Sequence, residues 1–172
     1  MHAEYKAIEG RAALRFERRF AHPVRDVWRA IADSDELARW FPSVVAGEIR
    51  AGGHLTFTFE ERDVPPMEGE VTEFDPPRTL AFWWGEDHLR FELAPATDGS
   101  QTDLRFTVLL GADDKAARDG AGWHVCLDAL KAALDGADPA VIHGVTDAWR
   151  ERYEEYERRG FPATAPIPGG ES

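Results

Sequence analysis

The sequence contains a single cysteine, Cys126, which excludes an intramolecular disulfide. Motifs for the common reactive sites are missing as well. No HExxH or CxxC spacing accompanies the six histidines, so nothing predicts a zinc site. GxGxxG, GxxxxGK and GxSxG are equally absent, which argues against a dinucleotide, a phosphate-loop nucleotide or a serine nucleophile. We therefore expect neither a metal nor a cofactor.

Basic residues are also scarce: 20 lysines and arginines face 32 aspartates and glutamates, giving a formal net charge of −12. Such an acidic surface repels phosphate backbones and anionic headgroups, so we expect no nucleic acid and no membrane surface as a partner. No apolar run approaches the roughly 20 residues that span a bilayer. Residues 1–11 lack the apolar stretch of a signal peptide, which favours a cytoplasmic location.

Aromatic residues are abundant: the 172 residues include ten Phe, six Trp and three Tyr. A chain of this length suits one domain with a sizeable core. The last twelve residues are rich in Pro and Gly, which is typical of a segment without a fixed structure. We predict a loose N-terminal arm over 1–11, a main domain over 12–136, an additional amphipathic helix over 137–160 and a flexible tail over 161–172.

Alternation of apolar and polar residues predicts β-strands through most of the main domain. In the first strand, Leu14, Phe16 and Phe20 share one face. Helical spacing between Pro23 and Phe41 then predicts two short helices. Short hairpin loops make the later strands antiparallel, because parallel pairs need long crossover connections. The predicted strands number seven and lie near 12–20, 45–49, 55–59, 67–74, 80–84, 89–93 and 102–108.

Two later segments return to helical spacing. The first predicts a long helix across the concave face of the sheet, and its apolar stripe is Trp123, Cys126, Leu127, Leu130 and Leu134. The second predicts an amphipathic helix over 140–159, and its stripe is Ile142, Val145, Trp149, Tyr153 and Tyr156. Because the connection around Pro139 is short, we expect this helix to dock on its own chain. The alternative is a homodimer interface.

Several motifs in this order carry a family resemblance. They are the segment from Phe20 to Trp28, Leu37 to Phe41, Gly52–Gly53, Gly69 to Leu80, and Gly122–Trp123 with Cys126, Leu127 and Leu130. The chain resembles the START-like, birch-pollen-allergen-like (SRPBCC) superfamily. Within it, the chain is similar to the bacterial family named after the activator of the heat-shock-protein-ninety ATPase. The resemblance implies an α+β helix-grip fold, in which a curved antiparallel sheet wraps a long C-terminal helix and leaves a cavity between them.

Aromatic and apolar residues predicted to face this cavity are the candidate ligand contacts, although the same side chains would equally fill a closed core. Arg18 joins them because it shares the inward parity of Phe16 and Phe20, and an inward charge needs a partner. Its alternative is to reach solvent from the end of the strand. The candidates are Arg18, Trp40, Phe57, Phe59, Trp84, Phe91, Phe106, Trp123 and Leu127.

The leading hypothesis is a protein that binds a small apolar or amphipathic ligand, with a stress- or chaperone-related role and no catalysis of its own. One alternative is an enzyme similar to the polyketide cyclases and aromatases, which share this fold. Arg18, His54 and His124 would then be its first catalytic candidates. A second alternative, which rests on the resemblance alone, is a chaperone-interacting module without a ligand.

Overall fold

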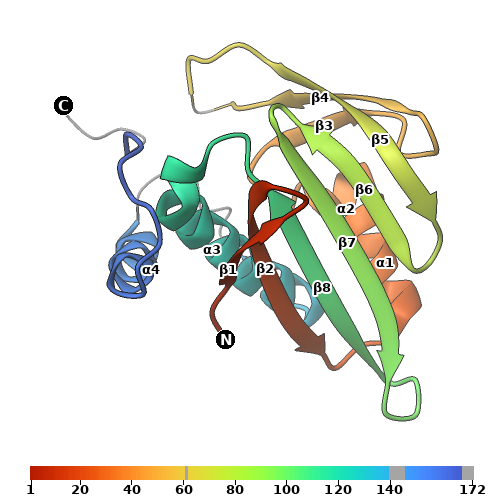
Figure 1. The fold of residues 1–172 in the computed structure, drawn as a ribbon. Helices are drawn as coiled ribbons and strands as arrows, with labels where there is room; N and C mark the ends of the chain where they lie inside the picture. Colours follow the sequence, from red (N-terminus) through yellow and green to blue (C-terminus); the bar gives the residue numbers. More distant parts are fainter. Residues whose placement is uncertain (61, 140–145, 168–172) are drawn as a thin grey trace.

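The structure is a computed structural model that describes residues 1–60, 62–139 and 146–167. Within these residues, eight strands, four α-helices and one short 3-10 helix follow one another (Figure 1). Their bounds are β1 Glu4–Ile8, β2 Arg11–Phe20, α1 Val24–Ala32, α2 Ser34–Leu37, β3 Val44–Gly47, β4 His54–Thr58, β5 Met67–Asp75, β6 Thr79–Trp84, β7 Asp87–Ala96, β8 Gln101–Leu109, η1 Asp113–Lys115, α3 Ala116–Leu134 and α4 Asp147–Arg158.

The strands form one antiparallel sheet in the order β1-β2-β8-β7-β6-β5-β4-β3. In this order β2 lies next to β8. The first long strand therefore pairs with the last strand, although the two are far apart in sequence. The sheet curves, and α1, α2 and α3 lie on its inner side (Figure 1). This arrangement confirms the predicted α+β helix-grip fold. No helix among the described residues is long and apolar enough to cross a membrane.

The N-terminal segment corrects one prediction. Residues 1–11 were expected to be a loose arm, but Glu4–Ile8 forms β1 and pairs with β2, so the sheet has eight strands instead of seven. Contacts with distant residues hold it in place: the Tyr5 ring lies 5.5 Å from the Phe161 ring, and the Ala3 N–H donates to Tyr156 Oη at 2.8 Å. A strand of five residues carries little periodic signal, which is why the pattern missed it.

The C-terminal helix α4 packs on α3 of the same chain (Figure 1). Thr146 caps it by accepting a hydrogen bond from the Trp149 N–H. Tyr156 is fully buried against α3, where a Cβ at Gly120 would lie 3.4 Å from its ring. The Tyr156 ring therefore lies directly over the α3 backbone at Gly120, at a distance where a Cβ would make an ordinary contact. The first part of the predicted helix, residues 140–145 with Ile142 and Val145, lies outside the described residues.

The start of the predicted flexible tail is also ordered. Phe161 is buried, and its ring lies 4.8 Å from the Tyr156 ring. Backbone hydrogen bonds run from the Ala117 N–H to the Pro162 carbonyl and from the Ala165 N–H to the Asp114 carbonyl. Residues 161–167 thus pack along η1 and the start of α3, which corrects the prediction, whereas 168–172 lie outside the described residues.

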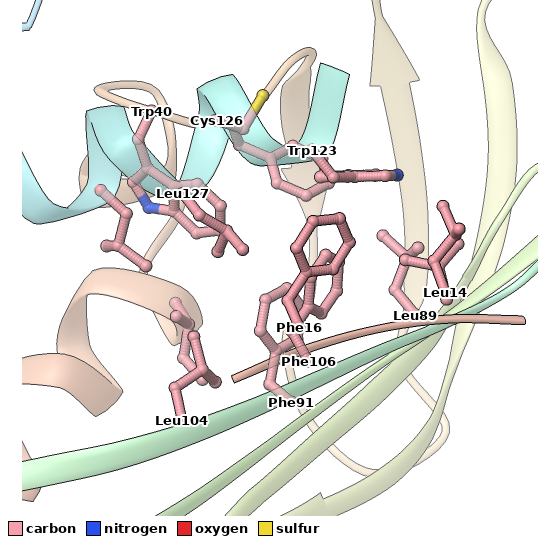
Figure 2. Close-up of a cluster of buried hydrophobic side chains, with 14 of the residues drawn as sticks. Leu14, Phe16, Trp40, Leu89, Phe91, Leu104, Phe106, Trp123, Cys126 and Leu127 are labelled. Carbon is pink, nitrogen blue, oxygen red and sulfur yellow. The ribbon is translucent and has the colours of Figure 1, made fainter. Parts of the chain in front are cut away.

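The middle of the sheet–helix interface is filled by aromatic rings (Figure 2). Phe91 and Phe106 stack at 4.5 Å between centroids, and Phe16 lies 6.0 Å from Phe106 on the other side. From α3, Trp123 meets Phe106 edge-on at 5.1 Å, and Leu127 is almost fully buried beside it. These rings occupy the space in which the sequence predicted a cavity.

Candidate ligand pocket

A cavity of about 710 Å³ opens at one end of the sheet–helix interface. Its walls come from residues 59–60 and 62–68, which follow β4 and run into β5, from the turn between β6 and β7, from the first half of α3 and from the start of α4. The side chains on its apolar side are Phe59, Met67, Trp84, Trp123, Cys126 and Trp149. The volume falls in the range of roughly 300–1,000 Å³ that is typical of small-molecule sites.

Tryptophan rings form the inner wall of the pocket. Trp84 and Trp123 meet edge-on at 5.3 Å between centroids, and Phe59 lies 5.9 Å from Trp84. The Trp84 indole N–H donates to Ser43 Oγ at 3.2 Å, which fixes the orientation of that ring. Trp149 belongs to α4 and faces Gly122, where an added Cβ would lie 3.8 Å from the indole nitrogen. The wall therefore combines residues from the sheet, α3 and α4.

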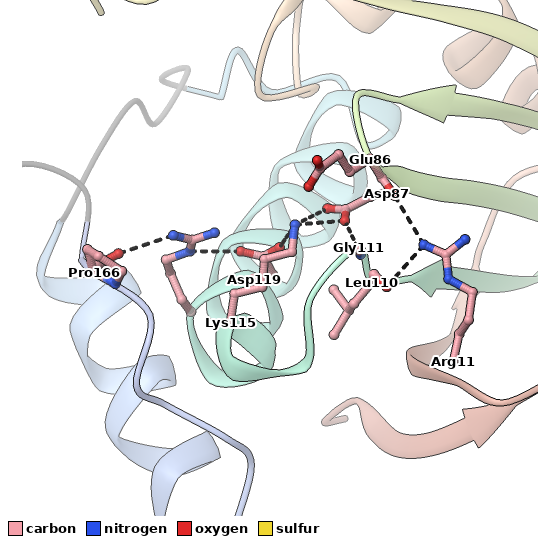
Figure 3. Close-up of polar contacts among 9 residues, drawn as sticks. Arg11, Glu86, Asp87, Leu110, Gly111, Lys115, Asp119 and Pro166 are labelled. Carbon is pink, nitrogen blue, oxygen red and sulfur yellow. Dashed lines mark hydrogen bonds and ion pairs between the residues drawn. The ribbon is translucent and has the colours of Figure 1, made fainter.

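A buried ion pair lies at the polar end of the pocket (Figure 3). Asp87, which is only 2% exposed, accepts two hydrogen bonds from Lys115 Nζ at 2.7 and 2.8 Å. It also accepts the Gly111 N–H at 2.7 Å. A buried carboxylate needs such partners, because losing water without them is costly. Asp87 therefore ties the β6–β7 turn to the start of the helical region.

Two further charged residues of α3 extend this cluster. Arg118 donates through Nε to Asp119 Oδ1 at 3.0 Å and through Nη1 to the Pro166 carbonyl at 3.1 Å. Lys115 Nζ lies 3.4 Å from the other carboxylate oxygen of Asp119. Burial nevertheless raises the pKa of Asp119 above its ordinary value, because these cations only partly offset the loss of water. Asp119 thus keeps unused acceptor capacity at the pocket wall.

Cys126 is a buried thiol on the pocket wall, and burial raises its pKa to about 12. Since the thiolate is the nucleophile, we expect no measurable alkylation by iodoacetamide in the folded protein at pH 8. Unfolding in guanidinium chloride should restore the rate of a free cysteine. Stoichiometric labelling of the folded protein within minutes would show that the thiol is accessible and ionised, contrary to this packing.

Eight of the nine sequence-predicted candidates are apolar, and these eight divide into two groups. Phe59, Trp84 and Trp123 line the pocket. The other apolar candidates are buried away from it and are Trp40, Phe57, Phe91, Phe106 and Leu127. Trp40 illustrates this, since its indole N–H donates to the Ala30 carbonyl at 2.9 Å within the core.

The polar candidates lie elsewhere. Arg18 donates to the Glu17 carbonyl at 2.9 Å, and its guanidinium lies 5.6 Å from the centroid of the Phe16 ring. His54 is exposed on β4 and pairs with Glu68. His124 is buried between α3 and α4. None of the three lines the pocket.

The polar pocket residues Asp87, Lys115, Arg118 and Asp119 were absent from the sequence-based candidates. Asp87 begins β7 directly after a turn and Lys115 lies at a helix start, both places where charged residues are common without any binding role. The two residues pair across 28 positions of the chain. No local spacing could have connected them.

His124 offers a pH-dependent test of the α3–α4 packing. Tyr156 Oη accepts the Ala3 N–H and lies within hydrogen-bond distance of His124 Nδ1, at 2.8 Å. Burial, and then the positive charges of Arg152 and Arg18, lower the pKa of His124 from 6.5 to about 3. Between these values the unfolded chain binds a proton that the folded chain does not. Stability should therefore fall as pH decreases below 6.5, by up to about 1.4 kcal/mol per pH unit from this group.

We expect His124→Gln to weaken this pH dependence between pH 6.5 and 5, as measured by urea unfolding at several pH values. Both proteins contain the same carboxylates, so the contribution of these groups to the pH dependence cancels in the comparison. His54→Gln is the matched control for the loss of a histidine, because His54 is exposed on β4 and far from the α3–α4 contact. Identical slopes for wild type and His124→Gln would mean that His124 titrates normally and is not buried as described.

Comparisons with known proteins agree with this architecture. The family model described as Activator of Hsp90 ATPase homolog 1-like protein matches residues 21–135. The crystal structure of CalU16 from Micromonospora echinospora aligns with a TM-score of 0.69 and 24% identity, covering 91% of this chain and 94% of that one. No curated protein matches the chain.

Two further solved structures are similar in extent. EF2215 from Enterococcus faecalis, a conserved protein of unknown function, gives a TM-score of 0.72 at 20% identity, covering 91% of this chain and 89% of its own. The protein encoded by BPP1335 from Bordetella parapertussis gives 0.65 at 27% identity, covering 92% of both chains. Because the family model spans more than half of the sequence, the chain belongs to the activator of Hsp90 ATPase homolog 1-like family, within the START-like (SRPBCC) superfamily.

Proposed function

We propose that this protein binds a small apolar or amphipathic molecule in the pocket between residues 59–60 and 62–68, α3 and α4. The observation that carries the proposal is the combination of a cavity of about 710 Å³, three tryptophan side chains on its wall and a charged cluster at one end. Apolar walls with a few placed polar groups are the usual make-up of a ligand site. The aromatic core beneath the pocket is closed and supports its inner wall.

The arrangement favours binding over catalysis. Asp87 and Lys115 satisfy each other, and the Gly111 N–H occupies a further acceptor position of Asp87. Neither group is therefore free to transfer a proton without breaking a buried pair. The candidates of the enzyme hypothesis, Arg18, His54 and His124, also lie outside the pocket. A role in holding a ligand agrees better with these contacts.

Gly122 provides the test, because it lies in α3 and lines the pocket. A leucine at this position would extend into the cavity, whereas the Cβ of alanine would make only an ordinary contact with Trp149. We expect the uncharged fluorescent probe N-phenyl-1-naphthylamine to bind wild type and Gly122→Ala alike. Its affinity for Gly122→Leu should be at least tenfold weaker.

Both replacements are better helix formers than glycine, so each variant should melt no lower than wild type. Thermal unfolding of the three proteins checks this. No rise in probe emission with wild type, or equal affinity for folded Gly122→Leu, would contradict the proposed site.

A further inference from the structure

The pocket wall carries an excess of acidic groups. Among the described lining residues, five carboxylates face three cations, and the chain as a whole has a formal net charge of −12. Two of the carboxylates lie in the buried polar end, and the rest are exposed around the opening. The acids are Glu60, Glu68, Glu86, Asp87 and Asp119, and the bases are Arg62, Lys115 and Arg118.

The two cations at the polar end of the pocket already donate hydrogen bonds to acceptors of the protein itself. Lys115 has three N–H groups, and Asp87 and Asp119 provide three oxygens within 3.4 Å of its Nζ. Arg118 donates to Asp119 and to the Pro166 carbonyl with two of its five N–H groups. A ligand carboxylate would have to displace an acceptor of Lys115 before that ammonium group could bind it, and it would meet the excess of acidic groups on the pocket wall.

Asp119 is in the opposite situation. A carboxylate has about four acceptor positions, and Asp119 uses one for Arg118 Nε and one for the more distant Lys115 Nζ. Its side chain is 13% exposed and lines the pocket. The raised pKa of Asp119 agrees with a negative charge that the neighbouring cations do not fully compensate. An incoming ammonium group would supply the missing donor.

The aromatic wall suits a cation as well. Trp84, Trp123 and Trp149 line the cavity, and indole rings are the aromatic groups that attract cations most strongly. Phe59 already has a cation over its ring, because the Arg62 guanidinium lies 5.8 Å from the ring centroid. The wall is therefore chemically compatible with a positive charge next to apolar groups.

We propose that the pocket selects cationic amphiphiles, meaning amines with an aromatic or alicyclic body, over carboxylates of the same shape. The inference rests on the proposed function and adds the charge of the ligand. The amine would donate to Asp119 while its apolar body lies against the tryptophan rings.

Three naphthalene compounds of matched shape test the preference by isothermal titration calorimetry at pH 7. They are 2-naphthylmethylamine, which is protonated at this pH, the neutral 2-naphthalenemethanol and the anionic 2-naphthoate. We expect the amine to bind wild type at least tenfold more tightly than the alcohol, and the carboxylate at least tenfold more weakly. Asp119→Asn should reduce the amine-to-alcohol affinity ratio at least fivefold.

Asp103→Asn is the matched control, because it removes one acidic charge from β8, outside the pocket lining, and should leave the ratio unchanged. If the alcohol binds and the carboxylate binds as tightly as the amine, the charge preference is wrong while the proposed function stands. If none of the three compounds binds wild type, the proposed function itself fails, and the preference with it.

Discussion

We expect Phe106→Ala to lower the free energy of unfolding by about 3–5 kcal/mol, the usual cost of deleting a buried phenylalanine ring. Phe106 is fully buried and stands at the centre of the aromatic core. It stacks on Phe91 and Phe16 and supports Trp123 from below. Its removal would leave a cavity, and the curved sheet and α3 could close it only by moving toward each other and disturbing the packing around it. Equilibrium unfolding in urea, monitored by circular dichroism, measures the loss.

Phe59→Ala is the matched control for this prediction. Phe59 is half-buried on the pocket wall, so its truncation should cost only about 1 kcal/mol, a fraction of the value for complete burial. The sequence pattern predicts that both phenylalanines face inward, whereas the structure buries Phe106 completely and places Phe59 on the pocket wall. A loss below about 1 kcal/mol for Phe106→Ala would mean that the middle of the interface is open and not filled.

The second large effect is expected at Lys115. Replacement by methionine should destabilise the fold by about 3–5 kcal/mol, because it leaves Asp87 buried and charged with only the Gly111 N–H as a partner. The double variant Asp87→Asn, Lys115→Met should recover a large part of this loss, since no unpaired buried charge remains. Chemical unfolding of the single and double variants measures both values.

Lys131→Met, in α3, controls for the loss of a lysine from the helical region that Lys115 begins. Lys131 pairs with Asp135 at 2.7 Å, but both side chains are largely in solvent, and exposed pairs contribute little. This variant should therefore unfold close to wild type. Equal losses for Lys115→Met and Lys131→Met would contradict the buried ion pair at the polar end of the pocket.

The sequence predicted the fold well because apolar periodicity, its strongest signal, shows which face of a strand or helix is buried. Alternation in β2, β7 and β8 placed Phe16, Phe91 and Phe106 on the inner side of the sheet, and all three lie there. The stripe of Trp123 and Leu127 placed the long helix across that side. These patterns depend on neighbours within one strand or one helix, so a single sequence contains them.

The position of the pocket could not be read in the same way. A face pattern says that Phe57 and Phe59 point inward, but not that Phe57 is fully buried while Phe59 borders an opening. That difference depends on where the sheet ends and on α4 bringing Trp149 to the wall. The position of α4 depends on contacts between distant segments, such as the hydrogen bond from the Ala3 N–H to Tyr156 Oη.

The central claim is that ligands bind at the open end beside α3 and α4, and the tryptophan indole N–H resonances test it most directly. Six single Trp→Phe variants assign the six signals in a 15N-labelled protein, which is then titrated with 2-naphthalenemethanol. We predict shifts for the indoles that line the pocket, Trp84, Trp123 and Trp149, and none for Trp28, Trp40 and Trp83. Shifts confined to Trp28, Trp40 and Trp83, or no shift at all at saturating ligand, would contradict the account.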